Sequence, residues 1–411
     1  MQQIITAGQV VTSPAQPPFA DSGVLLDGPT VTGVGGRDEL RAAAGGDVAV
    51  HDFPQATLLP GLINAHVHLA FGAELGVIDT LADTSDEELL EQMTVRAQTL
   101  LSCGVTTIRD MADRGGLAVR LRDQVTAGEV LGPRILAATA PLTPPGGHCW
   151  FLGGEVEGIE DVAEKVRANA DAGADLIKVM VSGGGLTPGG AAMHESQFGV
   201  EFLRAVVTEA HALGLPVAAH AHSPTAIADA AAAGVDTIEH CLWMTENRGF
   251  EPDDAVIAEI AAKGIAVCPA DSGDWRRFAH RMGDAKAKLY YGRAVALHEA
   301  GVTVIAGTDA GVFPFDEFPD VLARFHTDWG FSPAEVLAMA TTDAARALGL
   351  EGVAGVLVPG ASADCLVVDG DPLTDMGALR NVDLVVAGGR HLVPDREARH
   401  RSVYTGVGAA R

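Results

Sequence analysis

The sequence predicts an α/β protein: a (β/α)8 TIM barrel with a small β-sandwich domain formed by the N- and C-terminal segments. Eight short apolar runs alternate with alanine- and leucine-rich segments of helical spacing, which is typical of parallel strands buried on both faces. Both flanks of this region contain short strand-like runs separated by glycine and proline turns. A doubly wound open sheet is the alternative, but no glycine-rich phosphate turn follows the first predicted strand.

The first element is the N-terminal part of the sandwich, residues 1–56, where the alternating runs are Gln3–Val11, Ser22–Leu26 and Thr30–Val34. The barrel follows over residues 57–348. Its predicted strands are Thr57–His68, Gly104–Asp110, Arg134–Ala140, Ala174–Val181, Pro216–His222, Asp236–His240, Ile265–Ala270 and Val302–Ala310.

Helical spacing between these strands predicts helices at Asp86–Leu101, Ile159–Ala172, Gln197–Leu213 and Ala255–Lys263, and one more at Pro333–Leu348. The C-terminal part of the sandwich, residues 349–411, is predicted from the apolar runs Cys365–Val368 and Leu384–Ala387. Two β-rich flanks around one barrel combine most simply into a single small domain beside it.

Composition limits the classes of function. Acidic residues number 54 and basic residues 28, so the formal charge is −26, which disfavours binding to nucleic acid or to an anionic membrane. Hydrophobic residues make up 47%, enough for a large core. The five cysteines are an odd, sparse set, which predicts reduced thiols and a cytoplasmic location. No secretory signal and no apolar run of about 18 residues is present, so no membrane span is expected.

Histidine and aspartate recur where the predicted strands end. The first strand ends with His66 and His68, two residues apart and therefore on one side of the strand. One such pair would fit buried, hydrogen-bonded histidines equally well. The fifth, sixth and eighth strands, however, also end in such residues: His220 and His222, His240, and Asp309. Barrel enzymes carry their chemistry at these ends, and imidazole and carboxylate groups bind divalent metals, so a metal site is predicted.

Lys178 lies inside the apolar fourth strand, where a charged amine is costly unless it is paired or neutralised. One interpretation is a lysine that snorkels to solvent at the strand end. The other is a lysine that burial and nearby cations make neutral and that carbon dioxide converts to a carbamate. The two oxygens of a carbamate could bridge two metal ions.

Several motifs along the chain resemble one family as a set, although each alone is weak. They are Leu59–His68, Gly104–Asp110, Ile177–Lys178, Ala219–His222, Gly234–His240, Gly307–Ala310, Gly360–Asp364 and Gly388–Gly389. The chain resembles the amidohydrolase superfamily over nearly its whole length. Within it, the chain is most similar to the branch of imidazolonepropionase-like proteins, metal-dependent Xaa-Pro dipeptidases (prolidases) and ochratoxin-hydrolysing amidases.

The resemblance implies two divalent metal ions, with zinc as the expected metal. His66, His68 and Asp309 would hold one ion, His220 and His240 the other, and Lys178, carboxylated by carbon dioxide, would bridge both. Asn64 departs from the family, which usually has aspartate there, but it lies outside the ligand set.

The predicted reaction is hydrolysis of an amide or peptide C–N bond in a dipeptide, Xaa-Pro or N-acyl amino acid type of substrate. A metal-bridging hydroxide would attack the carbonyl, and Asp309 would pass its proton to the leaving nitrogen. His222 is the second predicted catalytic residue and would hold the substrate carbonyl or the oxyanion. His148, in a Gly-Gly-His loop, is predicted to contact substrate. Arg109 is expected to pair internally with Asp110 or Glu239, with a substrate carboxylate as its alternative partner.

Three other functions stay open. A deaminase or cyclic-amide hydrolase of the same superfamily is disfavoured by Lys178, because the resemblance implies that deaminases use one metal and no bridging lysine. A phosphotriester hydrolase shares the two-metal lysine site. A metal-free scaffold protein on this fold would have lost ligands, whereas all six positions are present. The expected partner is a small-molecule amide or dipeptide, and a homo-oligomer stays open.

Overall fold

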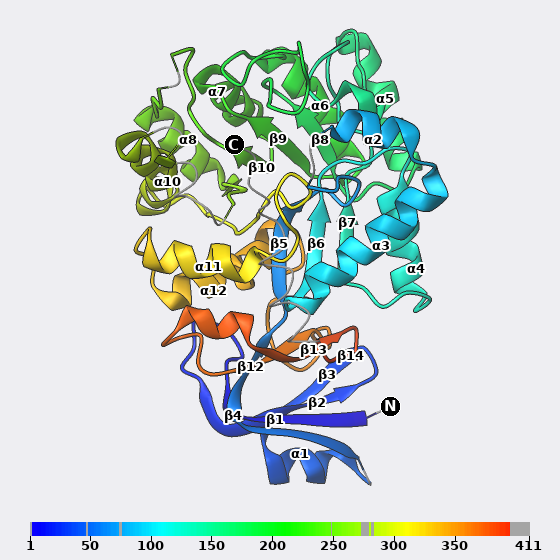
Figure 1. The fold of residues 1–411 in the computed structure, drawn as a ribbon, viewed down its shortest axis with the longest axis vertical. Coiled ribbons are helices and arrows are strands. Elements are labelled where there is room, and N and C mark those ends of the chain that lie inside the picture. Colours follow the sequence, from blue (N-terminus) through cyan, green and yellow to red (C-terminus); the bar gives the residue numbers. More distant parts are fainter. Residues whose placement is uncertain are drawn as a thin grey trace.

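A computed structural model describes residues 2–46, 48–73, 76–247, 249–272, 279–280 and 283–394. The chain forms a barrel with helices around it and, at one end of the barrel, a smaller β domain made from strands of both chain termini (Figure 1). The predicted α/β fold class is therefore confirmed. The last residues of the predicted C-terminal sandwich segment, 395–411, lie outside the described ranges.

The smaller domain is a seven-stranded sheet in the order β14-β13-β12-β4-β1-β2-β3. Strands from the two termini meet where β12 pairs antiparallel with β4, and β4 pairs parallel with β1. Apolar residues of β1, β2, β4, β12 and β13 bury themselves in one shared core. The strands are β1 (Gln2–Val10), β2 (Phe19–Asp27), β3 (Thr30–Gly36), β4 (Ala49–Pro60), β12 (Cys365–Asp369), β13 (Val382–Ala387) and β14 (Arg390–Leu392).

The predicted first barrel strand, Thr57–His68, is in fact two strands. Its first residues belong to β4 of the small domain, and the barrel begins with β5 after a break at Gly61. A Cβ atom at Gly61 would lie only 2.0 Å from Oγ1 of Thr106, so this crossing from one domain to the other requires glycine.

The barrel strands run parallel in two assigned sheets, β5-β6-β7 and β8-β9-β10-β11. The amide of Leu142 donates to the carbonyl of Lys178 and joins the two sheets on one side. The predicted eighth strand closes the other side through isolated bridges, Val304 with Val267 and Ala310 with Val67. The strands are β5 (Leu62–Val67), β6 (Val105–Asp110), β7 (Arg134–Ala137), β8 (Ile177–Met180), β9 (Val217–Ala221), β10 (Thr237–His240) and β11 (Ala266–Cys268).

Helices surround the barrel and bury one face each. In α3, buried residues recur at the spacing of one helix face, and Ser85 caps the helix by accepting a hydrogen bond from the Glu88 amide. The described helices are α1 (Arg37–Ala44), α2 (Val77–Asp83), α3 (Asp86–Ser102), α4 (Leu117–Thr126), α5 (Ile159–Asp171), α6 (Val200–Ala212), α7 (Pro224–Ala233), α8 (Asp254–Lys263), α10 (Asp284–Glu299), α11 (Phe318–Thr327), α12 (Pro333–Met339) and α13 (Thr342–Ala347), with short 3-10 turns η1 (Trp150–Leu152) and η2 (Met376–Arg380).

The four helices predicted between the strands are confirmed as α3, α5, α6 and α8, within a few residues at each end. The single helix predicted at Pro333–Leu348 is wrong, because the segment divides into α12 and α13. The reason lies at the break: the carbonyls of Met339 and Ala340 accept hydrogen bonds from the barrel amides of Ala306 and Ile63.

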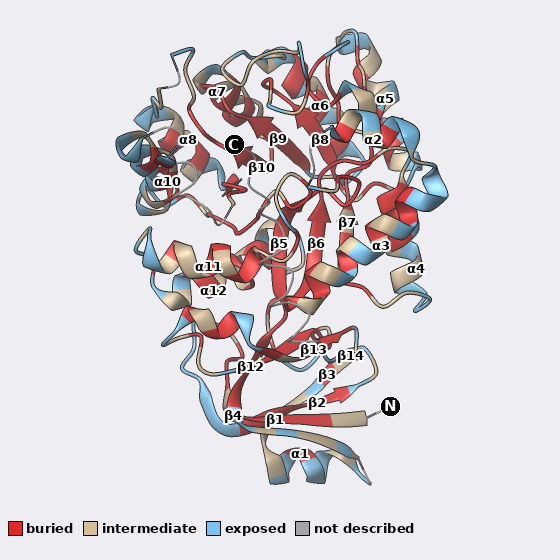
Figure 2. Cartoon of the chain, viewed as in Figure 1, coloured by how far each residue is buried: buried red, intermediate tan, exposed pale blue. Residues whose placement is uncertain are grey.

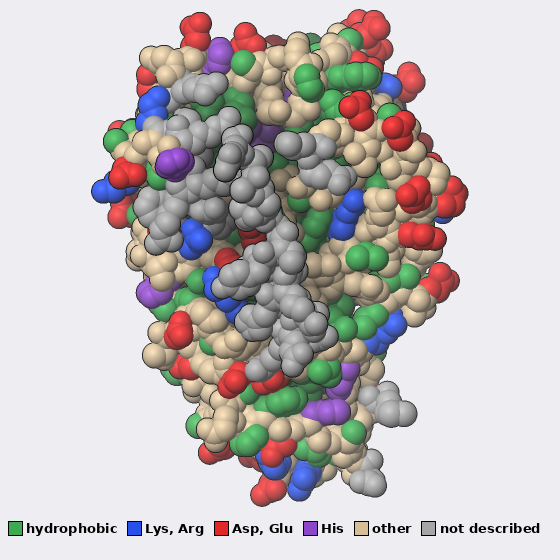
Figure 3. All heavy atoms as spheres, viewed as in Figure 1, with side chains coloured by type: hydrophobic (Ala, Val, Ile, Leu, Met, Phe, Trp, Pro, Cys, Tyr) green, Lys and Arg blue, Asp and Glu red, His purple; other side chains and the backbone are tan. Residues whose placement is uncertain are grey.

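The barrel strands are almost entirely buried, while the surrounding helices show exposed outer faces (Figure 2). Acidic side chains are scattered among basic ones over the face drawn in Figure 3, in keeping with the charge of −26. All five cysteines are free and buried. None of the described helices combines the length and hydrophobicity that a bilayer crossing requires.

Asp113, which follows β6, accepts hydrogen bonds from the first turn of α4, yet burial outweighs them and raises its pKa to about 6. The folded state thus binds a proton more tightly than the unfolded chain, so this carboxyl destabilises the fold as pH rises from about 4 to about 7. Asp113→Asn keeps an acceptor without the charge. Relative to wild type, the free energy of unfolding of Asp113→Asn should therefore increase by on the order of 2 kcal/mol between those two pH values.

Urea unfolding of both proteins at about pH 4.5 and about pH 7.5 measures this difference. The exposed Asp328 supplies a matched control in Asp328→Asn. If the difference in unfolding free energy between Asp113→Asn and wild type does not change with pH, the prediction is contradicted.

Candidate active site

The residues predicted to carry the chemistry gather at the carboxyl ends of the barrel strands. His66 lies in β5, Lys178 in β8, and His240 ends β10, while Asp309 lies in the segment that closes the barrel. His68 and His222 directly follow β5 and β9, whose last residues are Val67 and Ala221. The structure thus brings together all eight predicted residues: His66, His68, His148, Lys178, His220, His222, His240 and Asp309.

One half of the site consists of His66, His68 and Asp309. The Nε2 atoms of His66 and His68 lie 3.4 and 3.2 Å from Oδ1 of Asp309, and the three donor atoms are within 4.8 Å of one another. Burial alone would raise the pKa of Asp309, but its hydrogen bonds to the two imidazoles hold it well below the usual range. The carboxylate is therefore ionised at neutral pH and can act as a ligand or as a base.

The other half consists of His220, His222 and His240, whose donor atoms also lie within 4.8 Å of one another. The ring of His240 is 4.7 Å from that of His220 and 5.1 Å from that of His66, so it connects the two halves. Burial, followed by the charge of His148, lowers the pKa of His222 to about 3. His222 is therefore a neutral imidazole at neutral pH, close enough to serve either as a ligand or in its predicted contact with substrate.

Lys178 is fully buried, so the alternative of a snorkelling lysine is wrong. Its Nζ atom has no hydrogen-bond partner among the described residues, and burial lowers the pKa of this amine to about 8. An amine in this state is easier to deprotonate than a surface lysine and is therefore a better nucleophile at neutral pH.

The residues present fit a metal site. Three of their buried nitrogen atoms, Nζ of Lys178 and the Nδ1 atoms of His68 and His222, have no partner in the described part of the chain. Unpartnered polar atoms are uncommon inside proteins and call for an explanation such as a bound ion. Imidazole nitrogen and carboxylate oxygen, the donors available here, are common ligands of divalent zinc.

Glu239 is a supporting residue that the sequence analysis treated only as a partner of Arg109. Its Oε2 lies 2.7 Å from Nδ1 of His66, and its Oε1 accepts a 2.8 Å hydrogen bond from Nη2 of Arg109. Burial would raise the pKa of Glu239, but the charge of Arg109 and the bond to His66 hold it well below the usual range. This carboxylate orients the His66 ring so that Nε2 faces Asp309.

The predicted internal pairing of Arg109 with Glu239 is thus present. The same guanidinium donates to the carbonyl of Ala65 at 2.7 Å and to Oγ1 of Thr237 at 2.9 Å, so Arg109 links β5, β6 and β10 inside the barrel. A side chain with these partners braces the strand ends and does not extend toward a substrate.

Two further supporting residues, Arg293 and Asp271, had no signal in the sequence. Arg293 of α10 donates to the backbone carbonyl of His240 at 3.1 Å and forms a buried ion pair with Asp271, at 3.0 Å. His240 has a left-handed backbone, with φ of 66°. The arginine therefore fixes a strained residue of the candidate site from outside the barrel.

Left-handed backbone recurs at this rim in residues that are not glycine. His240, Cys241, Ala270 and Asp309 all have φ between 50° and 66°. Asn64, the departure from the family pattern, helps to hold the last of them: its side chain donates to Oγ1 of Thr308 at 2.8 Å and accepts from the Thr308 amide at 3.2 Å. Asn64 therefore positions the segment that carries Asp309.

His148, predicted to contact substrate, lies beside the second half of the site. Its ring is 4.8 Å from that of His220, and burial lowers its pKa to about 4. The loop after Lys178 makes room for it, because a Cβ atom at Gly184 would lie 2.2 Å from Nε2 of His148. Gly184 is thus explained by close approach to a site residue as well as by turn geometry.

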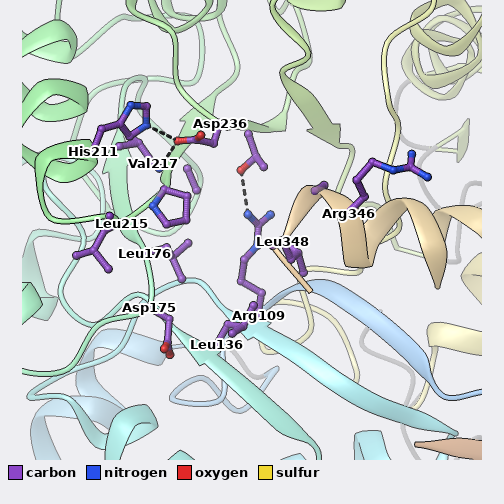
Figure 4. Close-up of a pocket in the computed structure, with 16 residues that line it drawn as sticks. Arg109, Leu136, Asp175, Leu176, His211, Leu215, Val217, Asp236, Arg346 and Leu348 are labelled. Atoms are coloured by element: carbon purple, nitrogen blue, oxygen red, sulfur yellow. Dashed lines mark hydrogen bonds and ion pairs between the residues drawn. The ribbon is translucent and has the colours of Figure 1, made fainter. Parts of the chain in front are cut away.

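A separate cavity of about 600 Å³ lies at the opposite end of the barrel, where β8, β9 and β10 begin (Figure 4). The charged groups that line it have partners within the protein: Asp236 with His211, Asp175 with Arg122, and Arg346 with Asp343. The imidazoles and carboxylate described above lie at the other ends of the strands, so this cavity is not the place of the chemistry.

Comparisons with known proteins agree with this geometry. The model of the amidohydrolase family matches residues 57–392. An uncharacterized protein of Mycobacterium tuberculosis is 31% identical over 88% of this chain and 91% of its own length, and ochratoxinase of Aspergillus niger is 25% identical over 91% and 82%.

Among solved structures, a Xaa-Pro dipeptidase with methionine bound in its active site superposes with a TM-score of 0.81. It is 26% identical in sequence, and the match covers 96% of this chain and all of that one. The family match spans the barrel and every residue of the site, so the chain belongs to the amidohydrolase family and is a hydrolase that acts on carbon–nitrogen bonds.

Proposed function

We propose that this protein is a binuclear metal-dependent amidohydrolase that cleaves the C–N bond of a dipeptide, a Xaa-Pro peptide or an N-acyl amino acid. The observation that carries the proposal is the buried amine of Lys178, which has no hydrogen-bond partner among the described residues and lies in the same cluster as two groups of side chains that could hold a metal ion. A mononuclear deaminase site would need no such lysine. The similarity to a Xaa-Pro dipeptidase over the whole chain supports the substrate class.

In this proposal, His66, His68 and Asp309 would hold one zinc ion, and His220 and His240 would hold the other. The neutral amine of Lys178 would add to carbon dioxide: its nitrogen would form a bond to carbon and release a proton, and the resulting carbamate, of charge −1, would offer its oxygens as ligands to the ions. Divalent cations at such a site polarise a carbonyl group and lower the pKa of bound water.

The protein's own residues then handle protons and position the substrate. Asp309 accepts the proton of the attacking water and delivers it to the leaving nitrogen, which one ionised carboxylate between two imidazoles can do with little movement. His222 holds the carbonyl oxygen as negative charge develops on it. His148, on the loop opposite His220, contacts the remainder of the substrate.

The proposal also includes the cellular location of the protein and the division of its chain into domains. The five free, buried thiols support a reducing, cytoplasmic location. The proposed division was predicted as residues 1–56, 57–348 and 349–411, and it is retained with its first boundary moved to Gly61, because β4 continues to Pro60 and pairs there with β12.

Metal content together with turnover tests the proposal. Protein stripped by a chelator and then restored should bind about two zinc ions per chain, and hydrolysis should disappear and return with them. The substrates to compare are Xaa-Pro dipeptides, N-acyl amino acids and aryl amides. One ion per chain would contradict the binuclear site, and activity confined to aminated heterocycles would instead identify a deaminase.

A further inference from the structure

A row of aromatic rings leads from the candidate metal site to the surface. Phe71 stacks on the ring of His68 with a centroid distance of 4.9 Å, and its ring lies 6.4 Å from that of Phe151. Phe151 in turn lies 6.4 Å from Trp150, edge to face. Exposure increases along this aromatic row: Phe71 is buried, Phe151 is half-buried, and Trp150 is 42% exposed.

The segment that carries the two outer rings is held in place. Trp150 and Phe151 belong to η1 (Trp150–Leu152), which is flanked by Cys149, with φ of 59°, and by Gly153, with φ of 89°. The amide of Cys149 donates to Oγ1 of Thr187 at 2.9 Å, and the amide of His148 donates to Oε1 of Gln197 at 2.8 Å. These hydrogen bonds hold the backbone that leads into Trp150, which lies two residues from a site residue and is exposed.

A single exposed apolar side chain is ordinary on a protein surface and indicates nothing by itself. Trp150 differs in its surroundings. Among the described phenylalanine and tryptophan residues, only Trp150 and Phe19 are exposed, at 42% and 49%. Phe19 lies in β2 of the small domain. Trp150 is the one that continues, ring by ring, to a residue of the candidate site.

We propose that Trp150 and Phe151 form a subsite for a flat apolar group of the substrate, such as an aromatic side chain carried next to the scissile amide. The inference rests on the proposed amide hydrolysis and narrows its substrate class. An aromatic group placed against the two rings would cover apolar surface that the fold leaves in water, and stacking adds to that gain. The subsite then sets which amides are cleaved, while the metal-binding residues determine the reaction.

The test compares two matched pairs of amides that differ in one side chain: N-acetylphenylalanine with N-acetylalanine, and Phe-Pro with Ala-Pro. Metal-replete wild type should prefer the aromatic member of at least one pair in kcat/KM. Trp150→Ala should lower this preference roughly tenfold, the amount expected for one lost aromatic contact. Trp150→Phe should retain most of it, and Phe19→Ala, the matched exposed aromatic, should leave it unchanged.

If Trp150→Ala lowers kcat/KM equally for both members of a pair, or leaves the preference unchanged, the proposed subsite is refuted while the proposed amide hydrolysis is not. If no variant hydrolyses any of the four compounds, the proposed function has failed on these substrates. Calorimetric binding of the same compounds then decides the subsite separately, since tighter binding of the aromatic member should still depend on Trp150. A change of oligomeric state in Trp150→Ala with an unchanged preference would instead make Trp150 a contact between copies and would overturn the proposal.

Discussion

Asp309→Asn is expected to lower kcat by roughly 10²- to 10⁴-fold, the range typical of losing a positioned general acid–base group. Asparagine has nearly the same shape and can still accept a hydrogen bond from His66 or His68, which lie 3.4 and 3.2 Å from the carboxylate. It cannot accept and return a proton at neutral pH. The expected signature is therefore protein that folds normally, keeps bound metal, and turns over very slowly.

Steady-state kinetics and metal analysis on the same sample separate the two roles of Asp309. The exposed Asp328, mutated to asparagine, controls for the change of charge. Turnover near the wild-type rate in Asp309→Asn with metal retained would show that another group moves the proton. A loss of metal together with turnover would assign Asp309 to ligation alone.

Lys178→Met should have the second large effect. Methionine fills a similar volume without an amine, so the fully buried position stays packed and loses a group that has no hydrogen-bond partner among the described residues. Since no carbamate can form, we expect about one metal ion per chain or fewer and a fall in kcat/KM of roughly 10³-fold or more. Thermal stability of the metal-free protein should be unchanged or higher, because a buried polar group without a partner is unfavourable.

Three measurements check this result: metal content, kcat/KM, and the carbonyl resonance of wild type supplied with isotopically labelled bicarbonate. The labelled signal should be present in wild type and absent in Lys178→Met. Lys263→Met, at a half-exposed lysine paired with Glu259, is the matched control. Two bound ions and near-normal activity in Lys178→Met would refute the bridging role, and the absence of a labelled signal in wild type would refute carboxylation.

The sequence alone was sufficient to predict the structure where the regular spacing of a strand or helix fixes the direction of its side chains. Histidines two residues apart at strand ends, as in His66 and His68, have to point the same way, and parallel strands have to end at one face. The prediction that widely separated residues meet at one rim therefore needed no knowledge of loop conformation. The four helices between strands were predictable for the same reason, since each buries a face of regular spacing.

The sequence failed where a single backbone conformation decides the outcome. Glu239 and His240 are adjacent, and strand alternation places adjacent side chains on opposite faces. The left-handed φ of 66° at His240 breaks that alternation, so both residues serve the site. Gly61 likewise divides one apolar run between two domains through a close approach to Thr106, a contact that is 45 residues distant along the chain and has no local pattern.

Residues that act across tertiary distance were also beyond prediction. Arg293 reaches the carbonyl of His240 from a helix outside the barrel, and its partner Asp271 comes from the loop after β11. Neither lies in a motif, and nothing in their spacing connects them to a strand end. Only the folded geometry shows that they support the site.

The left-handed residues at the rim imply a conflict between heat resistance and catalysis. Each costs about 1 kcal/mol relative to ordinary backbone, against a net folding free energy of about 5–15 kcal/mol for a typical protein. At Ala270, glycine would relieve that cost without removing a functional group, but at His240 and Asp309 relief by glycine would delete the imidazole or the carboxylate itself. Selection for thermal stability alone would therefore favour loss of these side chains. Variants obtained by such selection should be checked first for the imidazoles and the carboxylate of the candidate site.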